Sequence, residues 1–409
     1  MTALETRDAS AFLHQAGSTP VDHVFVTCEG AWATDETGHR FLDFHGNSCH
    51  NIGYRHPKLI AALKEQLDTL SFTPRLFTSE PPVELAEMLA ACWPYGPAKV
   101  LLGVSGADAI EMALKLAYIA TGRTSTVAFD GSWHGAALGA LSVGGTAGER
   151  NGLPALEGCH HAPSYWPRRQ GEDPETCARG SFDGLKKIFE GDQIAALIAE
   201  PVRSTGQAAP DWFWPEVRTL CDRAETLLIF DEIPTGLGKT GRLFASEHTG
   251  IAPDVTVLGK SLGGGVLPLS AVIARTELDV AGHLGIGHYT HQKNPVLARA
   301  GIETLRIIEA ENLVTSSAVK GRGALTALER MIEEIPAYEV ATGLGLSMAV
   351  ACSNPGQLKA LKDACYRLGL NTGATDGRLL TLSPPLTISG DELAKATDIL
   401  RHAAREVVS

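Results

Sequence analysis

The sequence predicts an α/β protein built around a mostly parallel, doubly wound sheet. From about residue 98, short apolar runs that end in Gly, Asp or Lys alternate with segments of helical spacing. Strands that alternate with helices imply crossover connections, which join parallel strands. The 409 residues are 44% hydrophobic and 20% charged, which suffices for a large core in two or three domains. The expected strands are Lys99–Val104, Thr126–Phe129, Ala195–Ala199, Leu227–Phe230, Val255–Leu258 and Leu269–Ala274.

Different patterns flank this α/β region. On its N-terminal side we expect a helix near Ala11–Ala16, a hairpin, and a helix over Pro57–Leu70 with a periodic apolar face. The hairpin segments are His23–Cys28, Ala31–Asp35 and Arg40–Phe44, with a turn at Thr37-Gly38. A long helical segment from Pro295 to Ile335 and an α+β tail follow the region. We therefore expect a large domain over residues 51–294 and a small domain over 295–409, with one cleft between them. The N-terminal segment 1–50 is expected to form part of the small domain.

Composition and charge argue against several classes of partner. With 35 Lys and Arg against 47 Asp and Glu, the formal net charge is −12, which disfavours a nucleic-acid-binding face. No run approaches the roughly 20 apolar residues of a membrane span, and the N-terminus lacks the features of a secretory signal. The eight cysteines are scattered without a CxxC pair, as in reduced proteins. We expect a cytoplasmic protein that binds no membrane, nucleic acid or metal.

Candidate functional residues follow the predicted strands, because ligands of open α/β sheets bind at the carboxyl ends of the strands. Ser105 and Gly106 stand between the first run and a helical segment, where free N–H groups can bind an anion; the alternative is a plain N-cap. Trp133 beside His134 follows the second run. This pair can offer a flat stacking face, and the alternative is a rim aromatic with a surface histidine.

Two charged residues follow later runs. Asp231 ends a buried strand, where a carboxylate needs a cationic partner such as a protonated ring nitrogen; the alternative is an N-cap. Lys260 ends another strand beside several glycines. A desolvated lysine there is a candidate Schiff-base amine, and the alternative is a lysine snorkelling from a sheet edge.

These four strand ends together predict one ligand. An anion site, a flat ring, a carboxylate and a lysine occur in that order along the chain. Such a set suits a phosphorylated aromatic aldehyde with a basic ring nitrogen. The sequence therefore predicts a site for pyridoxal 5′-phosphate.

Over nearly its whole length, from Val24 to the Pro384-Pro385-Leu386 segment, the chain resembles the class III aminotransferase group of fold type I pyridoxal-phosphate enzymes. The resemblance implies a large domain with a mostly parallel seven-stranded sheet and a smaller α+β domain. The matching stretches are Ser105-Gly106-Ala107-Asp108-Ala109, Trp133-His134-Gly135, Glu200-Pro201-Val202, Asp231-Glu232-Ile233, Thr235-Gly236, Thr240-Gly241-Arg242, Pro253-Asp254, Gly259-Lys260 and Asn294-Pro295.

The resemblance also implies roles for individual residues. Lys260 would carry the cofactor as a Schiff base and later move the proton. Asp231 would keep the pyridine nitrogen protonated, which makes the ring an electron sink. The remaining cofactor contacts would be Ser105, Gly106, Ala107, Trp133, His134 and Glu200, with Thr290 supplied by a neighbouring subunit. A phosphate site shared in this way implies a homodimer with active sites at the interface.

Three departures from the family pattern bear on the reaction. Pro234 stands where a glutamine usually contacts the cofactor's 3′ oxygen. Thr381 stands where an arginine usually binds the substrate carboxylate, and Thr205 where a glutamate often masks that arginine. A bidentate arginine–carboxylate pair has two charge-assisted hydrogen bonds, each worth about 1.5–3 kcal/mol, which a threonine cannot replace. A transaminase needs a carboxylate clamp for its keto acid. The departures therefore favour an elimination, a racemisation or a mutase reaction over transamination.

Several positions are cationic or polar where the family is usually uncharged, or lie in segments that border the cleft in relatives. Each alone reads as a solvated side chain, but together they favour a tetrahedral anion, phosphate or phosphonate, as the group recognised. The candidate substrate contacts are His45, Asn47, His50, Arg75, Arg203 and Lys293.

The favoured hypothesis is an ammonia-lyase, since the chain resembles the class III branch that acts on 1-hydroxy-2-aminoethylphosphonate and yields phosphonoacetaldehyde and ammonia. The acid that protonates the leaving hydroxyl is left open among His45, His50 and His134. The alternative is a transaminase for an ω-amine or an aminophosphonate. A third possibility, a non-catalytic binding protein, is disfavoured because such a protein has no need of both Lys260 and Asp231.

Overall fold

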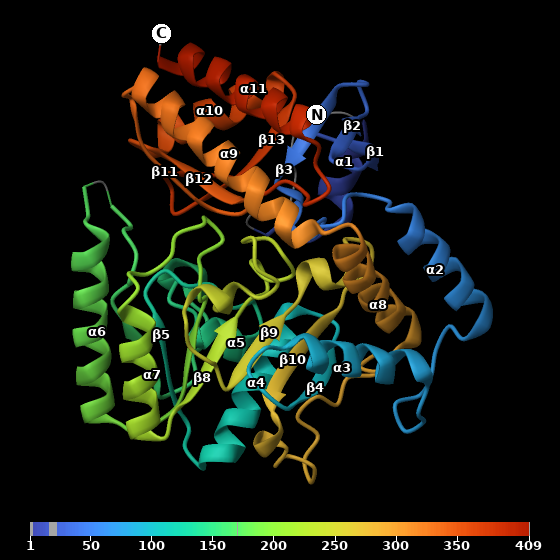
Figure 1. Cartoon of the computed structure of the whole chain (residues 1–409), viewed down its shortest axis with the longest axis vertical. Helices are drawn as coiled ribbons and strands as arrows, with labels where there is room; N and C mark the ends of the chain where they lie inside the picture. The colour runs from blue at the N-terminus through green and yellow to red at the C-terminus, as the bar shows by residue number, and fades with distance from the viewer. Residues whose placement is uncertain (1–2, 16–22, 170, 409) are drawn as a thin grey trace.

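The computed structural model describes residues 3–15, 23–169 and 171–408, which form two seven-stranded sheets with helices packed on them (Figure 1). The first sheet has the strand order β4-β10-β9-β8-β7-β5-β6. Its strands are parallel except β10, which runs antiparallel to both β4 and β9. The bounds are β4 Ala98–Gly103, β5 Ser125–Phe129, β6 Cys159–Ala162, β7 Ile194–Ala199, β8 Leu227–Asp231, β9 Val255–Leu258 and β10 Ser270–Arg275.

This sheet confirms the predicted α/β class, and each of the six predicted runs is one of its strands. The seventh strand, β6, was not predicted, because Cys-His-His-Ala has no apolar run and lies at the edge of the sheet. Alternate side chains point to opposite faces. Ile229 packs with α4 (Gly106–Thr121), whereas Leu228 and Phe230 pack with residues of α7 (Phe213–Ala224). Helices thus cover both faces, as a doubly wound sheet requires.

The second sheet joins the two ends of the chain. Its order is β1-β2-β3-β13-β14-β12-β11, and the parallel pairing of β3 with β13 connects the N-terminal strands to the C-terminal ones. The expected N-terminal hairpin is confirmed as β1 to β3. The bounds are β1 Phe25–Glu29, β2 Trp32–Asp35, β3 Arg40–Phe44, β11 Tyr338–Leu344, β12 Ser347–Cys352, β13 Leu370–Thr375 and β14 Leu379–Leu382. Helices α9, α10 and α11 pack on this sheet, at the top of Figure 1.

Two helix predictions need correction. The helix expected near Ala11–Ala16 is α1, which ends at Ala11; positions 12–15 are not helical and residue 16 lies outside the described residues. The long segment from Pro295 is two helices, because Asn312 adopts a left-handed conformation (φ 51°) between them. The helices not yet given bounds are α1 Ala3–Ala11, α2 Pro57–Thr69, α3 Glu80–Cys92, α5 Leu138–Val143, α6 Pro174–Gly191, α8 Pro295–Ala310, α9 Leu313–Glu334, α10 Pro355–Arg367 and α11 Gly390–Val408.

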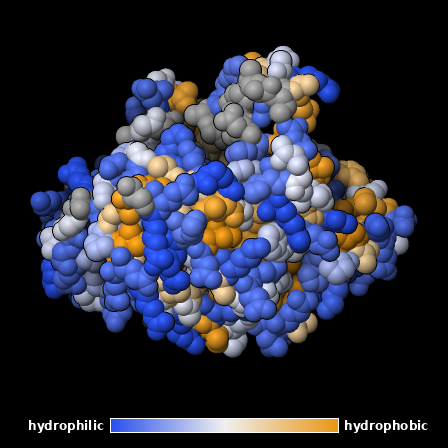
Figure 2. Space-filling view, turned by 90° about the horizontal axis from the view of Figure 1, so that it is seen from above, coloured by the Kyte–Doolittle hydropathy of each residue, from blue (hydrophilic) through white to orange (hydrophobic). Residues whose placement is uncertain are grey.

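The described residues also include five short 3-10 helices: η1 Gly46–Ser48, η2 Ala147–Arg150, η3 Ala245–His248, η4 Lys260–Gly263 and η5 Thr276–Leu278. Seen from the side of the second sheet, the surface is mostly hydrophilic with separate apolar patches (Figure 2). Among the helices of the described ranges, none combines the length and the apolarity that a membrane span needs.

Candidate active site

The carboxyl ends of three strands of the first sheet meet through two glycines. A Cβ added to Gly106, after β4, would lie 2.8 Å from Cδ1 of Ile233, which follows β8. A Cβ added to Gly259, after β9, would lie 3.3 Å from Ile233 and 3.7 Å from the Cα of Gly106. These close approaches explain why side chains are absent at both positions. The parallel strands therefore bring the predicted functional residues together at the carboxyl end of the sheet.

Asp231 forms a buried pair with His134 at the carboxyl end of the sheet. Oδ2 of Asp231 lies 2.8 Å from Nδ1 of His134, and Oδ1 accepts a hydrogen bond from the backbone N–H of Ile233 at 3.0 Å. Both side chains are almost completely buried, so the surface alternative for His134 is wrong. Neighbouring Trp133 is 45% exposed and leaves an aromatic surface available beside the pair.

The start of α4 provides backbone donors for an anion. Ser105 is the N-cap, and its hydroxyl accepts the N–H of Asp108 at 3.1 Å, so the N-cap interpretation holds for its side chain. Ser270 in β10 donates to the carbonyl of Ser105 at 2.6 Å and fixes the turn. The N–H groups of Gly106 and Ala107, in the first turn, have no carbonyl partner within their helix and point along the positive end of its dipole.

Lys260 follows directly on β9 and Gly259. Because β9 is an internal strand between β10 and β8, the alternative of a lysine at a sheet edge is wrong. The backbone of Lys260 is left-handed (φ 43°), which costs a non-glycine residue about 1–3 kcal/mol and is typical of functional sites. Its side chain is exposed at the end of the sheet that carries Asp231 and Gly106. This arrangement suits an amine that reacts with a bound ligand.

The segment after β3 divides its three predicted residues into two kinds. His50 is fully buried, its Nε2 lies 3.0 Å from the carbonyl of Asp43, and burial lowers its pKa to about 4. A Cβ at Gly46 would lie 2.2 Å from Nδ1 of His50, so this histidine is packed into the turn. His45 and Asn47 are exposed. The geometry thus favours a structural role for His50 over the predicted substrate contact.

Arg203 belongs to an internal ion-pair group. Its guanidinium lies 2.7 Å from Oε2 of Glu200 and 3.2 Å from Oδ2 of Asp376, in the turn between β13 and β14. It also stacks over the ring of Trp166, 4.2 Å from the centroid, and only 4% of it is exposed. The predictions of Arg203 as a substrate contact and Glu200 as a cofactor contact are therefore not favoured, because each charge is already matched inside the protein.

Removing Arg203 is expected to destabilise the protein. In R203A, Glu200 would remain buried without its partner, and breaking a buried pair in this way costs about 3–5 kcal/mol. Urea unfolding followed by tryptophan fluorescence measures the change. R179A, which removes an exposed partner of Glu175 on α6, is the matched control and should cost less than about 1 kcal/mol. Equal effects of the two variants would contradict a buried ion-pair group.

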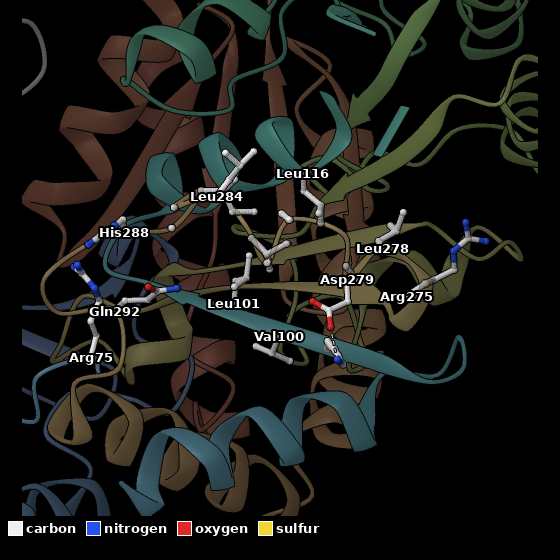
Figure 3. A pocket seen from close by; sticks show the side chains of 18 residues that line it. Arg75, Val100, Leu101, Leu116, Arg275, Leu278, Asp279, Leu284, His288 and Gln292 are labelled. Atoms are coloured by element: carbon white, nitrogen blue, oxygen red, sulfur yellow. Dashed lines mark hydrogen bonds and ion pairs between the residues drawn. The ribbon is translucent and has the colours of Figure 1, made fainter. Parts of the chain in front are cut away.

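Arg75, Thr290 and Lys293 lie elsewhere on the chain. Arg75 lines a cavity of about 410 Å³ with His288 and Gln292, at the side of the sheet where β4 and β10 pair (Figure 3). Neither Lys260 nor the other residues of the strand-end group line this cavity. Thr290 and Lys293 are exposed in the adjoining loop. Within one chain, these three predicted residues are not brought to Lys260.

The departures from the family pattern are also resolved. Thr381 lies in β14, opposite Gly373 of β13. Thr205 is buried and its hydroxyl lies 2.9 Å from Oε1 of Gln207. Pro234 follows the buried Asp231-Glu232 pair of residues and offers no side-chain donor.

Lys239 is a buried lysine that the sequence patterns do not indicate. Lys239 is fully buried, and its Nζ donates to the carbonyl of Pro384 at 2.7 Å, which ties the loop after β8 to the segment after β14. Burial lowers the pKa of Lys239 from 10.5 to about 7. The small residues around it, Gly238 and Gly241 among them, were the signal of a tightly packed loop.

Lys239 gives a pH-dependent stability. Between pH 7 and 10.5 the unfolded chain carries a proton on this lysine that the folded chain lacks, so stability rises with pH in that window. Each unit of pKa shift corresponds to about 1.4 kcal/mol. The stability of K239M relative to wild type, measured as the difference between their urea midpoints, should therefore be larger at pH 7 than at pH 9. K64M, at an exposed position of α2, should show no such trend; parallel pH curves for wild type and K239M would contradict the interpretation.

The chain is similar to known proteins over most of its length. The family model for aminotransferase class-III matches residues 14–404. The chain is 35% identical to an (R)-1-hydroxy-2-aminoethylphosphonate ammonia-lyase of Vibrio splendidus, over 99% of this chain and 90% of that protein. It is 34% identical to an acetylornithine aminotransferase of Methanopyrus kandleri, over 93% and 94%. A solved amine transaminase of an uncultivated Pseudomonas species, with pyridoxal phosphate bound, has a TM-score of 0.89 and 30% identity over 97% and 98%.

Proposed function

Because this chain belongs to the class III aminotransferase family, whose cofactor is pyridoxal 5′-phosphate, we propose that it is an ammonia-lyase for an amino alcohol that bears a phosphonate. The proposed reaction converts 1-hydroxy-2-aminoethylphosphonate to phosphonoacetaldehyde and ammonia. The observation that carries it is Thr381, which stands in place of the carboxylate-binding arginine. Thr381 lies opposite Gly373 of β13, and the exposed His45 borders the same glycine. The 35% identity to a lyase with this substrate supports it.

The residues at the carboxyl end of the sheet fit the cofactor. The N–H groups of Gly106 and Ala107 would hold the phosphate, Trp133 would face the ring, and the Asp231 carboxylate would pair with the ring nitrogen. When bound, the cofactor withdraws electrons from the amine-bearing carbon of the substrate. His134 orients Asp231, because the 2.8 Å contact and the burial of both groups leave the carboxylate little freedom.

Two proton positions then define the work of the chain. Lys260 would bind the cofactor in the resting enzyme and, once the substrate amine has replaced it, remove the proton from the amine-bearing carbon. The neighbouring carbon then loses hydroxide, which needs a proton from an acid. We propose that residues 51–294 bind the cofactor and that the described parts of residues 1–50 and 295–409 form the smaller domain.

The test is incubation of the purified holoenzyme with 1-hydroxy-2-aminoethylphosphonate alone. Ammonia and phosphonoacetaldehyde formed in equal amounts, without any keto acid, support the lyase. Strict dependence on pyruvate or 2-oxoglutarate rejects it. The second candidate, a transaminase for an ω-amine or aminophosphonate, is supported by the transaminase relatives and structures. It predicts an amine form of the cofactor that accumulates with the donor and is reversed by a keto acid.

We also propose a homodimer in the cytoplasm. Exposed apolar side chains occur in the segments that border the Arg75 cavity: Leu76 is 90% exposed, Phe77 65% and Leu284 51%. Apolar side chains exposed together mark interfaces. A partner bound there would bring Thr290 to the second phosphate site. The eight cysteines are free thiols, which supports a reducing compartment.

The L76E variant tests the dimer. A carboxylate buried in an apolar interface costs several kcal/mol, so L76E should sediment as a monomer and bind the cofactor at least about tenfold more weakly. Analytical ultracentrifugation and cofactor titration measure both effects. L67E, at an exposed apolar position of α2, is the control and should sediment as wild type does. A wild-type protein that sediments as a monomer would reject the proposal directly.

A further inference from the structure

We propose that His45 is the acid that protonates the leaving hydroxyl, and that Gly373 and Thr381 hold it in place. This inference rests on the proposed lyase function, since only an elimination needs such an acid. It chooses among the three histidines that the sequence leaves open.

The other two histidines are buried, and each has one ring nitrogen in a polar contact and one without a partner. Nε2 of His50 lies 3.0 Å from the carbonyl of Asp43, and the ring is fully buried and stacked on Tyr54. His134 is buried, and its Nδ1 contacts the carboxylate of Asp231 at 2.8 Å. His45 alone of the three is exposed, so it alone can meet a substrate without unpacking the protein.

The register of the second sheet sets His45 beside Thr381. β3 ends at Phe44, which pairs with Thr372 of β13, so His45 comes level with Gly373. Gly373 in turn pairs with Thr381 of β14. A Cβ added at Gly373 would lie 2.7 Å from Nδ1 of His45 and 2.2 Å from Oγ1 of Thr381. The missing side chain at 373 therefore makes room for an imidazole and a hydroxyl over the same point.

The same segment also reaches Lys260. η1, which begins one residue after His45, packs against η4, which begins at Lys260. A Cβ added at Gly265, just after η4, would lie 3.1 Å from the carbonyl of Cys49. His45 is thus close enough for the positive charge of Lys260 to lower its pKa, after the larger effect of burial. An acid at 45 and a base at 260 would act on neighbouring carbons of one substrate.

The charges around His45 explain when it would carry a proton. Although the side chain of His45 is exposed at the surface, the protein atoms around it partly desolvate the ring. This desolvation, Lys362 and Lys260 lower its pKa, whereas Asp43 and a hydrogen bond with Asn47 raise it. The net effect in the free protein is a pKa below the ordinary value of a histidine. A phosphonate bound beside it would supply negative charge and favour uptake of a proton from solvent.

The chemical step balances without a redox partner. Lys260 takes the proton from the amine-bearing carbon, and that electron pair forms the new carbon–carbon double bond. The carbon–oxygen bond breaks with its electrons on oxygen, and the imidazolium of His45 gives that oxygen a proton, so water leaves. Water then hydrolyses the released enamine to phosphonoacetaldehyde and ammonia.

The experiment compares H45N with the wild-type holoenzyme on three compounds. Ammonia release from 1-hydroxy-2-aminoethylphosphonate should fall about 10²–10⁴-fold, the usual contribution of a general acid. Release from 1-fluoro-2-aminoethylphosphonate should fall less than about tenfold, because fluoride leaves with little need of a proton. Deuterium exchange into 2-aminoethylphosphonate, which has no leaving group, should change little, since it needs Lys260 alone. G373A, which pushes a methyl group into His45, should show the same selectivity.

H402N, at an exposed histidine of α11, is the control and should match wild type throughout. Equal losses of H45N on all three compounds would overturn the proposal, because a binding or structural role affects every substrate alike. Full activity of H45N on the hydroxyl compound would overturn it too. Failure of the proposed function looks different: the wild type itself would then release no ammonia and would need a keto acid.

Discussion

K260A is expected to lower ammonia release by at least about 10³-fold and to abolish covalent attachment of the cofactor. The lysine would act twice, as the amine that binds the cofactor and as the base at the amine-bearing carbon. Its left-handed backbone (φ 43°) directly follows the internal strand β9, at the same end of the sheet as Asp231 and Gly106. Activity and the visible absorbance of the cofactor measure the loss.

Borohydride reduction followed by peptide mapping identifies the attachment site. Label should appear on the peptide that contains Lys260 in the wild type and be absent from K260A. K64A, at an exposed lysine of α2, controls for the loss of a surface charge and should label as wild type does. Label that persists in K260A, or a colourless wild-type protein that borohydride does not label, would remove the basis of the assigned site.

D231N should slow the reaction about 10²–10⁴-fold while leaving the fold intact. An amide is neutral and close to isosteric, so it cannot hold a proton on a ring nitrogen as a carboxylate does. The buried contact with His134 at 2.8 Å should survive in part, because an amide oxygen can still accept from Nδ1. Solvent deuterium exchange into 2-aminoethylphosphonate should fall with the overall rate, since the electron sink itself is weakened.

Two readouts separate this effect from damage to the fold. The unfolding midpoint of D231N should stay near that of wild type, and the absorbance of the bound cofactor should shift with the protonation of its ring. D183N, at an exposed carboxylate of α6, is the control and should change neither. Exchange within threefold of wild type would show that Asp231 does not face the ring nitrogen.

The relatives show how one scaffold serves several reactions. The chain is at least 30% identical to proteins named as an ammonia-lyase, an acetylornithine aminotransferase and an alanine/serine racemase. In the proposed site, Lys260 and Asp231 would supply what such reactions share, removal of a proton from the amine-bearing carbon. The residues around the substrate, above all His45 and Thr381, would then decide whether the neighbouring carbon loses its substituent.

The amino-acid sequence by itself determined which residues meet in the proposed site. Lys260, Asp231 and the Ser105–Ala107 turn each follow an apolar run, and the structure brings these strand ends together. In a parallel sheet, the residues that follow successive strands lie at the same edge whatever the order of the strands. The prediction needed only local periodicity and strand direction, and these are properties that a linear sequence carries.

Tertiary structure alone decided which charges remain for a substrate. Arg203 was predicted to contact the substrate, but in the structure it pairs with Glu200 and with Asp376, far along the chain. For His134, the structure excludes the alternative of a surface histidine, because the ring is buried against Asp231. His45 gained Thr381 as a neighbour only through the pairing of β3 with β13 and β13 with β14. These contacts depend on strand order and register between distant segments. Local patterns report which face a side chain takes, but not which residue it meets there.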